Sequence, residues 1–240
     1  MELLTENYKL LLLIGAVPAF FIVVPVVITY VSVQAMRRGV HLEPAPESTY
    51  RAQFHRVDQH QGWAEDNGFE FNGGYTMMLG VKSFVAAWKH REEPTYFVML
   101  LAADKQVYTF TTEFSEAFSL DTTGSDDDML PSPPGHYKQG FSGLSLVDLY
   151  QRHLEGVQYL RSNGHIQTRP RNPSLQDAVS RDAKRQAAYI QTLPLYPFRA
   201  VYWFYIWKKL KNNQSIEQLH KSGKVLLPND PGFRKFEYGE

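Results

Sequence analysis

The sequence predicts an α+β domain joined to one transmembrane helix. An uncharged run of 24 residues (10–33) lies near the N-terminus, β-branched and aromatic segments fill much of residues 69–114, and helical periodicity follows. Strands followed by helices favour the α+β class over an alternating parallel sheet. The chain has 240 residues, of which 43% are apolar, and this suffices for one domain with a core and an appendage.

The apolar run is long enough to cross a bilayer. As a helix it would extend about 36 Å, whereas a bilayer core is about 30 Å thick. We therefore predict that residues 1–38 form a transmembrane anchor, which Pro18 and Pro25 bend. One alternative is a buried core helix, which the lack of a polar face disfavours. The other is a signal peptide cleaved near Ala35, but the run exceeds the usual apolar length of about 7–15 residues.

The charges beside the apolar run predict its orientation. Arg37 and Arg38 follow the run, whereas only Lys9 and the terminal amine precede it. Short loops rich in Lys and Arg stay on the cytoplasmic side. We therefore expect a single-pass membrane protein whose C-terminal domain is cytoplasmic.

The segment after the anchor predicts a linker and then a soluble domain. Residues 39–50 contain Pro44 and Pro46, which favour an extended connection. Residues 51–240 are then left for a soluble α+β domain.

The first half of this domain predicts an antiparallel meander. Asn72-Gly73-Gly74 is typical of a hairpin turn, because Asn and Gly tolerate a positive φ. Residues 81–90, 96–103 and 107–114 have the β-branched and aromatic composition of further strands. Connections this short force neighbouring strands to be antiparallel, so we expect four or five strands in a meander.

The second half predicts a long loop and capped helices. Residues 121–140 are rich in Asp, Pro and Gly, and a loop of this length is functional or disordered. Ser145 predicts the cap of a helix that Asn163-Gly164 would end in the left-handed conformation. Ser174 predicts the cap of a second helix, which ends before Pro194. His153 falls on the apolar side of the first helix, where a hydrogen-bonded core histidine is the expected outcome.

Residues 198–211 combine aromatic and basic side chains. The uncharged stretch between Arg199 and Lys208 is too short to span a bilayer. Trp and Tyr favour the headgroup region, and lysines favour an anionic leaflet, so we predict a helix at the membrane interface. A core helix packed on the sheet and a groove for a protein partner are the alternatives. The predicted interface residues are Arg37, Arg38, Tyr202, Trp203, Trp207, Lys208, Lys209 and Lys211.

Catalytic and metal-binding signatures are weak in this sequence. It contains no phosphate-binding loop, no G-x-S-x-G, no G-x-G-x-x-G after a predicted strand, and no H-E-x-x-H. The remaining polar candidates are His55, Asp58, His60 and His136. A helix would place His55 and Asp58 on one face but not His60, so a metal site would need a further ligand. We therefore predict neither a metal site nor a cofactor.

Composition removes several further classes of function. Lys plus Arg and Asp plus Glu number 25 each, and no basic-aromatic sheet motif is present, so we expect no nucleic-acid partner. The absence of Cys excludes disulfides and thiolate chemistry. Asp126-Asp127-Asp128 lacks the glycine and distal Glu of a calcium loop, and Pro131-Ser132-Pro133-Pro134 is too short for a strong polyproline signal.

These observations predict a membrane-anchored binding, accessory or scaffold module whose partners are the bilayer and a protein. One alternative is an anchored hydrolase-like enzyme with residues 121–140 as a lid over His55, Asp58, His60 or His136. The other is a sensor that binds a small ligand on the sheet.

Overall fold

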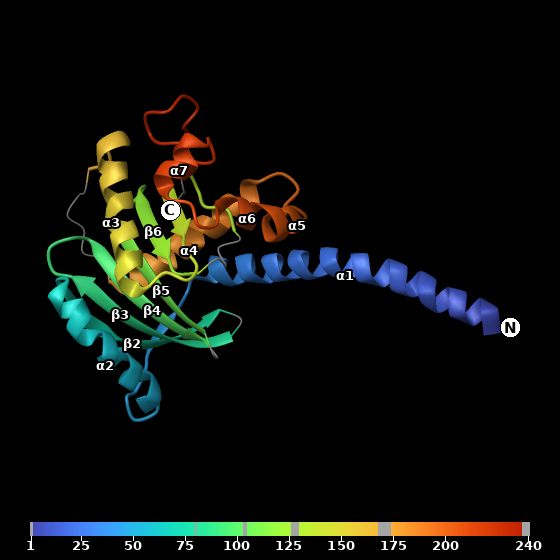
Figure 1. Cartoon of the computed structure of the whole chain (residues 1–240), viewed down its shortest axis with the longest axis horizontal. Helices are drawn as coiled ribbons and strands as arrows, with labels where there is room; N and C mark the ends of the chain where they lie inside the picture. Colours follow the sequence, from blue (N-terminus) through green and yellow to red (C-terminus); the bar gives the residue numbers. More distant parts are fainter. Residues whose placement is uncertain (1, 80, 103–104, 126–129, 168–173, 237–240) are drawn as a thin grey trace.

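The computed structural model describes residues 2–79, 81–102, 105–125, 130–167 and 174–236. A long N-terminal helix extends from a body that consists of one sheet with helices on both faces (Figure 1). The body has strands first and helices after them, so the predicted α+β class is confirmed.

The sheet has seven strands, and their order in space follows their order in the chain. All neighbours are antiparallel except β6 and β7, which are parallel. The strands are β1 (Leu42–Pro44), β2 (Phe69–Leu79), β3 (Val81–His90), β4 (Thr95–Ala102), β5 (Lys105–Glu113), β6 (Ser119–Thr123) and β7 (His136–Gly140).

The strand count exceeds the prediction because three short strands, β1, β6 and β7, were not expected. The predicted strands correspond to β2–β5, the segment expected as a linker supplies β1, and the segment expected as a loop supplies β7 and the end of β6. Leu42 of β1 pairs with Met77, and its backbone N–H also donates to the Gln176 side chain at 2.6 Å. Edge strands need partners on one side only, so even short polar segments can add to a sheet.

The predicted hairpin at residues 72–74 is wrong. β2 continues through this point, and its register shifts between Phe71 and Gly73, as in a β-bulge. Gly73 has a φ of 145°. A Cβ on Gly74 would lie 2.6 Å from Cζ of Phe54, so the second glycine allows a helix to pass close to the sheet.

The helices cover both faces of the sheet. They are α1 (Glu2–Arg38), α2 (Arg51–Asp66), α3 (Leu146–Asn163), α4 (Leu175–Thr192), α5 (Ala200–Tyr202), α6 (Lys208–Lys211) and α7 (Ile216–Lys221), and the π-helical turn η1 (Trp203–Trp207) joins α5 to α6. Helices α2 and α3 pack on one face around Trp88, Phe97 and Phe110. On the other face, Leu175 of α4 packs with Val40, Leu42 and Tyr96.

The two predicted helix caps are confirmed, but the end of α3 differs. Ser145 accepts a hydrogen bond from the Asp148 N–H, and Ser174 accepts one from that of Asp177. Gly164 has a φ of −87°, so it is not the left-handed residue expected there. The positive φ falls on His165 instead, at 49°.

Between residues 19 and 38, helix α1 is most buried where it meets the body. Val33 and Met36 pack with Ala187 and Ile190 of α4 and with Trp203. The stretch Ala19–Arg38 is long and apolar enough to cross a membrane, and 22% of its most apolar part is buried inside the protein. Its exposed apolar side chains are Phe20, Phe21, Ile22, Val23, Val27, Ile28, Tyr30 and Val31.

Candidate functional site

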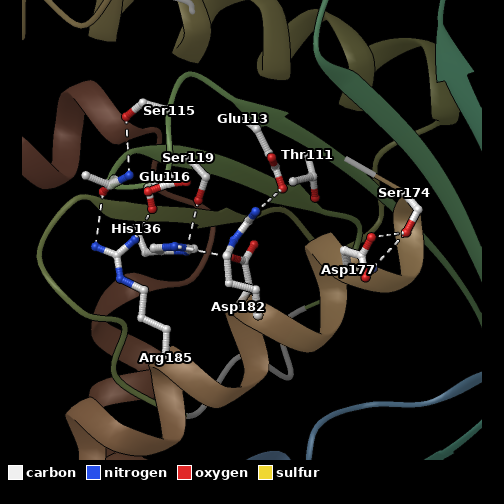
Figure 2. Close-up of polar contacts among 12 residues, drawn as sticks. Thr111, Glu113, Ser115, Glu116, Ser119, His136, Ser174, Asp177, Asp182 and Arg185 are labelled. Carbon is white, nitrogen blue, oxygen red and sulfur yellow. Dashed lines mark hydrogen bonds and ion pairs between the residues drawn. The ribbon is translucent and has the colours of Figure 1, made fainter. Parts of the chain in front are cut away.

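A cluster of polar side chains lies between α4 and the sheet (Figure 2). Ser119 and His136 begin the parallel strands β6 and β7 and are partners in register, so both side chains lie on the same face. On α4, Arg181, Asp182 and Arg185 fall within little more than one turn and approach this face.

His136 lies between a hydroxyl and a carboxylate. Its Nδ1 is 2.9 Å from Oγ of Ser119, and its Nε2 is 3.6 Å from Oδ1 of Asp182. The His136 side chain is 6% exposed and that of Asp182 is 26% exposed. The hydrogen bond to Ser119 therefore holds the ring deep in the fold, while Asp182 remains accessible.

The two arginines of α4 hold this helix against the end of β5 and the connection from β5 to β6. Nη1 and Nη2 of Arg185 donate to the backbone oxygens of Glu116 and Ala117, at 2.6 and 3.3 Å. Arg181 forms an ion pair with the buried Glu113 at 2.6 Å, and its Nε lies 3.5 Å from Asp182. Charged donors make strong bonds to buried acceptors, so α4 is held in a fixed position over the cluster.

Burial sets the protonation of the central pair. Desolvation, helped by the negative charges of Asp121 and Glu113, raises the pKa of Asp182 to about 7. Desolvation also lowers the pKa of His136 well below its usual value, and the nearby cations Arg185, Lys138 and Arg181 act in the same direction. At neutral pH a neutral imidazole therefore lies beside a carboxyl group that is about half protonated.

The cluster borders a cavity of about 250 Å³. Its charged and titratable lining residues are Tyr96, Glu113, Asp121, His136, Lys138 and Asp182. Met36 and Val40, at and just after the end of α1, also line it. A second hollow of about 450 Å³ lies over β4–β6 and shares Asp121 and Lys138. We call these two hollows together the sheet groove.

The groove offers acid–base groups, but the serine that is hydrogen-bonded to His136 does not reach it. Ser119 is 3% exposed and does not line either hollow. A serine must reach the substrate to act as a nucleophile, so the Ser119–His136–Asp182 chain lacks this property. Asp182 lies on the cavity wall, and its pKa near neutrality suits it to take up or release a proton there.

The other predicted polar candidates lie elsewhere. His55 and Asp58 are exposed on α2. His60 contacts Tyr108 and Gln106, on the sheet face opposite His136. The four candidates therefore do not converge, and the described part of the chain contains no group of three His, Asp or Glu residues suited to a metal.

The predicted interface segment packs on α1 and α4. Trp203 is 5% exposed among apolar side chains of both helices, and Tyr205 donates a hydrogen bond to the Phe21 backbone oxygen at 3.2 Å. The core alternative placed this segment against the sheet, whereas α5 lies beside α1 (Figure 1). Tyr202 and Lys209 are exposed, Trp207, Lys208 and Lys211 are half-buried, and Arg37 and Arg38 are exposed at the end of α1.

Sequence reasoning missed most of the cluster. Ser119, Asp182 and Arg185 come from segments without a catalytic motif. The available signal was the spacing of Arg181 and Arg185, which fall on the side of α4 that carries its apolar residues. Comparison with protein-family models, curated proteins and solved structures found no match to this chain.

Proposed function

We propose that this chain is a single-pass, membrane-anchored binding module that presents the sheet groove beside a bilayer, as an accessory or scaffold subunit for a protein partner. One observation carries the proposal: the end of α1 is part of the body and part of the groove wall. Met36 packs with Ala187 and Ile190 of α4 and also lines the cavity. A ligand in the groove would therefore contact the anchor itself.

The exposed apolar surface supports the membrane part of the proposal. Large apolar side chains rarely gather on one exposed helix of a soluble protein. Beside α1, the segment 195–210 adds a second exposed row at helical spacing. This row consists of Leu195, Phe198, Tyr202, Ile206 and Leu210. Lipid would cover both rows, with Lys208, Lys209 and Lys211 at the headgroups.

The basic residues at the base of α1 support a cytoplasmic location for the body. Arg37 and Arg38 are exposed and end the helix. Positive charges next to a span favour the cytoplasmic side. We propose this orientation, with the N-terminus on the opposite side of the membrane.

The shape and chemistry of the groove support binding. Its floor is a sheet face that carries the hydroxyls of Thr109, Thr111 and Thr123 beside Lys138 and the acidic residues Glu113 and Asp121. A surface that combines charged and hydroxyl groups suits a polar chain laid across the strands. Tethering to a membrane raises the local concentration of a partner, which benefits a binding module.

Site-specific photocrosslinking in native membranes tests this proposal. Thr109→p-benzoylphenylalanine places the probe in the groove, and His55→p-benzoylphenylalanine places it on exposed α2 as the matched control. We expect the full chain in the membrane fraction after a carbonate wash, and one discrete adduct from position 109 only. Equal adducts from both positions, or a protein washed off by carbonate, would contradict the proposal.

A second candidate is an anchored enzyme that uses Asp182 as a general acid or base. The observation in its favour is a titratable carboxyl group on a cavity wall, with a pKa of about 7. The full-length detergent-solubilised protein would then show a bell-shaped or sigmoidal pH–rate profile in a substrate screen. Asp182→Asn would abolish that activity while leaving the crosslink from position 109 intact.

A further inference from the structure

We propose that another pocket, distinct from the two hollows of the sheet groove and lined by the Pro131–Pro134 loop, binds a phosphate-bearing anion. This pocket has a volume of about 350 Å³ and is separate from the sheet groove except where His136, Lys138 and part of the loop border both. Its walls come from four segments: the loop and β7, α4, the η1–α6 helix, and residues 224–234.

The first argument is charge. Four basic residues line the pocket, namely Lys138, Lys211, Lys224 and Arg234. The lining set contains no Asp or Glu among the described residues. This contrasts with the chain as a whole, in which acidic and basic residues balance. A concave site with one sign of charge concentrates ligands of the opposite sign.

The second argument is hydrogen bonding. Nε1 of Trp207 and Oγ of Ser132 are both buried, and neither has a hydrogen-bond partner in the described part of the chain. Both residues line this pocket. An indole N–H can only donate, and leaving it unpaired costs about 1–3 kcal/mol. A ligand oxygen would supply the missing acceptor, and phosphate oxygens are strong acceptors.

The third argument is position. Trp207 packs against the cluster that contains Val33 and Met36 of α1, so the pocket adjoins the base of the proposed anchor. Apolar side chains, including Tyr189, Val225 and Phe233, complete the walls. This combination suits a phosphate group attached to an apolar body. An anionic lipid headgroup and a soluble phosphate ester share this chemistry. Only the lipid source rests on the proposed function, because phosphate binding does not require a membrane.

The probe is the indole N–H signal of Trp207 in the ¹⁵N-labelled full-length protein in uncharged detergent. Inorganic phosphate is titrated first, followed by short-chain phosphatidylglycerol, with short-chain phosphatidylcholine as the zwitterionic control. We expect saturable shifts with phosphate and with phosphatidylglycerol. Tighter binding of phosphatidylglycerol identifies a lipid headgroup as the source, and tighter binding of phosphate identifies a soluble one.

Three variants test the assignment. Lys211→Gln combined with Arg234→Gln should weaken binding at least 10-fold, and Trp207→Phe should weaken it about 5-fold when a ³¹P signal is followed. Lys209→Gln changes an exposed lysine of the same helix that does not line the pocket, so it should leave the binding of inorganic phosphate unchanged.

Three results would overturn the inference. One is the absence of saturable shifts with either anion, and another is an equal loss of affinity for inorganic phosphate in Lys209→Gln and in the double variant. The third concerns residues 237–240, which carry Glu237 and Glu240. If the added anions bind only after these four residues are deleted, the site is filled by the chain itself and takes no external ligand.

Discussion

His153 links α3 to two strands through threonine hydroxyls. Its Nε2 and Nδ1 each lie 2.8 Å from a hydroxyl, that of Thr112 and that of Thr122. The ring is fully buried, and desolvation lowers its pKa to about 3. A neutral imidazole has one donor and one acceptor nitrogen, so one hydroxyl accepts a hydrogen bond from the ring and the other donates one to it.

We predict that acid weakens the fold through His153. Between about pH 6.5 and pH 3 the unfolded chain binds a proton that the folded chain excludes, so the stability contributed by this residue falls as the pH falls. His153→Ala should lower the free energy of unfolding by about 2–4 kcal/mol at pH 7. This cost should be about 2 kcal/mol smaller at pH 5, because protonation of His153 in the unfolded chain lowers the stability of the wild type and the variant has no such group.

Urea unfolding at pH 7 and pH 5 measures both values. The exposed His55 supplies the control, since His55→Ala removes a titratable ring without buried contacts. A cost for His153→Ala that is independent of pH would show that the ring takes up a proton in the folded state as readily as in the unfolded chain.

Asp182 should respond to pH in the opposite direction. Its pKa rises from 3.8 to about 7 on folding, so the folded chain keeps a proton that the unfolded chain loses. The stability contributed by this residue is highest below pH 4 and declines as the pH rises toward 7. Asp182→Asn should therefore stabilise the protein at pH 8 by about 1–2 kcal/mol, because the amide is never charged.

The same variant should have little effect at pH 4, where the aspartate is already protonated. Thermal unfolding at both pH values provides the measurement. Destabilisation at pH 8 would mean that the ion pairs of Asp182 outweigh its desolvation, and the assignment of a proton-carrying group on the cavity wall would then fail.

These two residues show where sequence reasoning succeeds and where it stops. His153 could be predicted as a core histidine because helical periodicity alone places it on the apolar side of α3. Asp182 could not, because its environment depends on residues 46 to 69 positions earlier in the chain, including His136 and Glu113. Pairing across a sheet edge determines those distances, and a single sequence does not contain them.

At the scale of elements, local patterns predicted the long strands and the capped helices. They missed the short strands β1, β6 and β7, which form because a neighbouring strand is available for pairing. They also failed at Asn72-Gly73-Gly74, since a bulge and a hairpin turn both favour Asn and Gly. In each case a neighbouring strand decided the outcome.

The bulge region yields a prediction about helix α2. Gly74→Ala would bring a methyl group 2.6 Å from Cζ of Phe54 and 3.1 Å from that of Phe84, so the ring of Phe54 must move away from the sheet. We expect a loss of about 1–3 kcal/mol in the free energy of unfolding. Gly62→Ala is the matched control, because its added methyl group meets nothing within 4 Å and alanine favours the helix.

Denaturant unfolding followed by tryptophan fluorescence distinguishes the two variants. Trp63 of α2 lies beside Phe69 and Phe97, so its emission reports directly on the position of this helix. Equal stability of Gly74→Ala and the wild type would mean that α2 does not pack as closely as the Gly74–Phe54 contact requires.

At the scale of the whole molecule, helix α1 and the body are coupled through one cluster. Val33 is fully buried with Ile190 and Trp203, although Val31, only two residues earlier, is 55% exposed. The sequence does not distinguish these two valines, because both belong to an uninterrupted apolar run. Their difference arises from the helices that pack on one side of α1.

We predict that this coupling can be measured as an interaction energy. In mild detergent, Val33→Ala should destabilise the body by about 1–2 kcal/mol, whereas Val31→Ala should leave its unfolding unchanged. Combining Val33→Ala with Ile190→Ala should cost less than the sum of the single changes, by about 0.5–1.5 kcal/mol, because both remove the same packing. Additive costs, or an equal effect of the two valine variants, would mean that α1 moves independently of the body. The groove could then not be held against its anchor, and the reason for placing a binding site there would be lost.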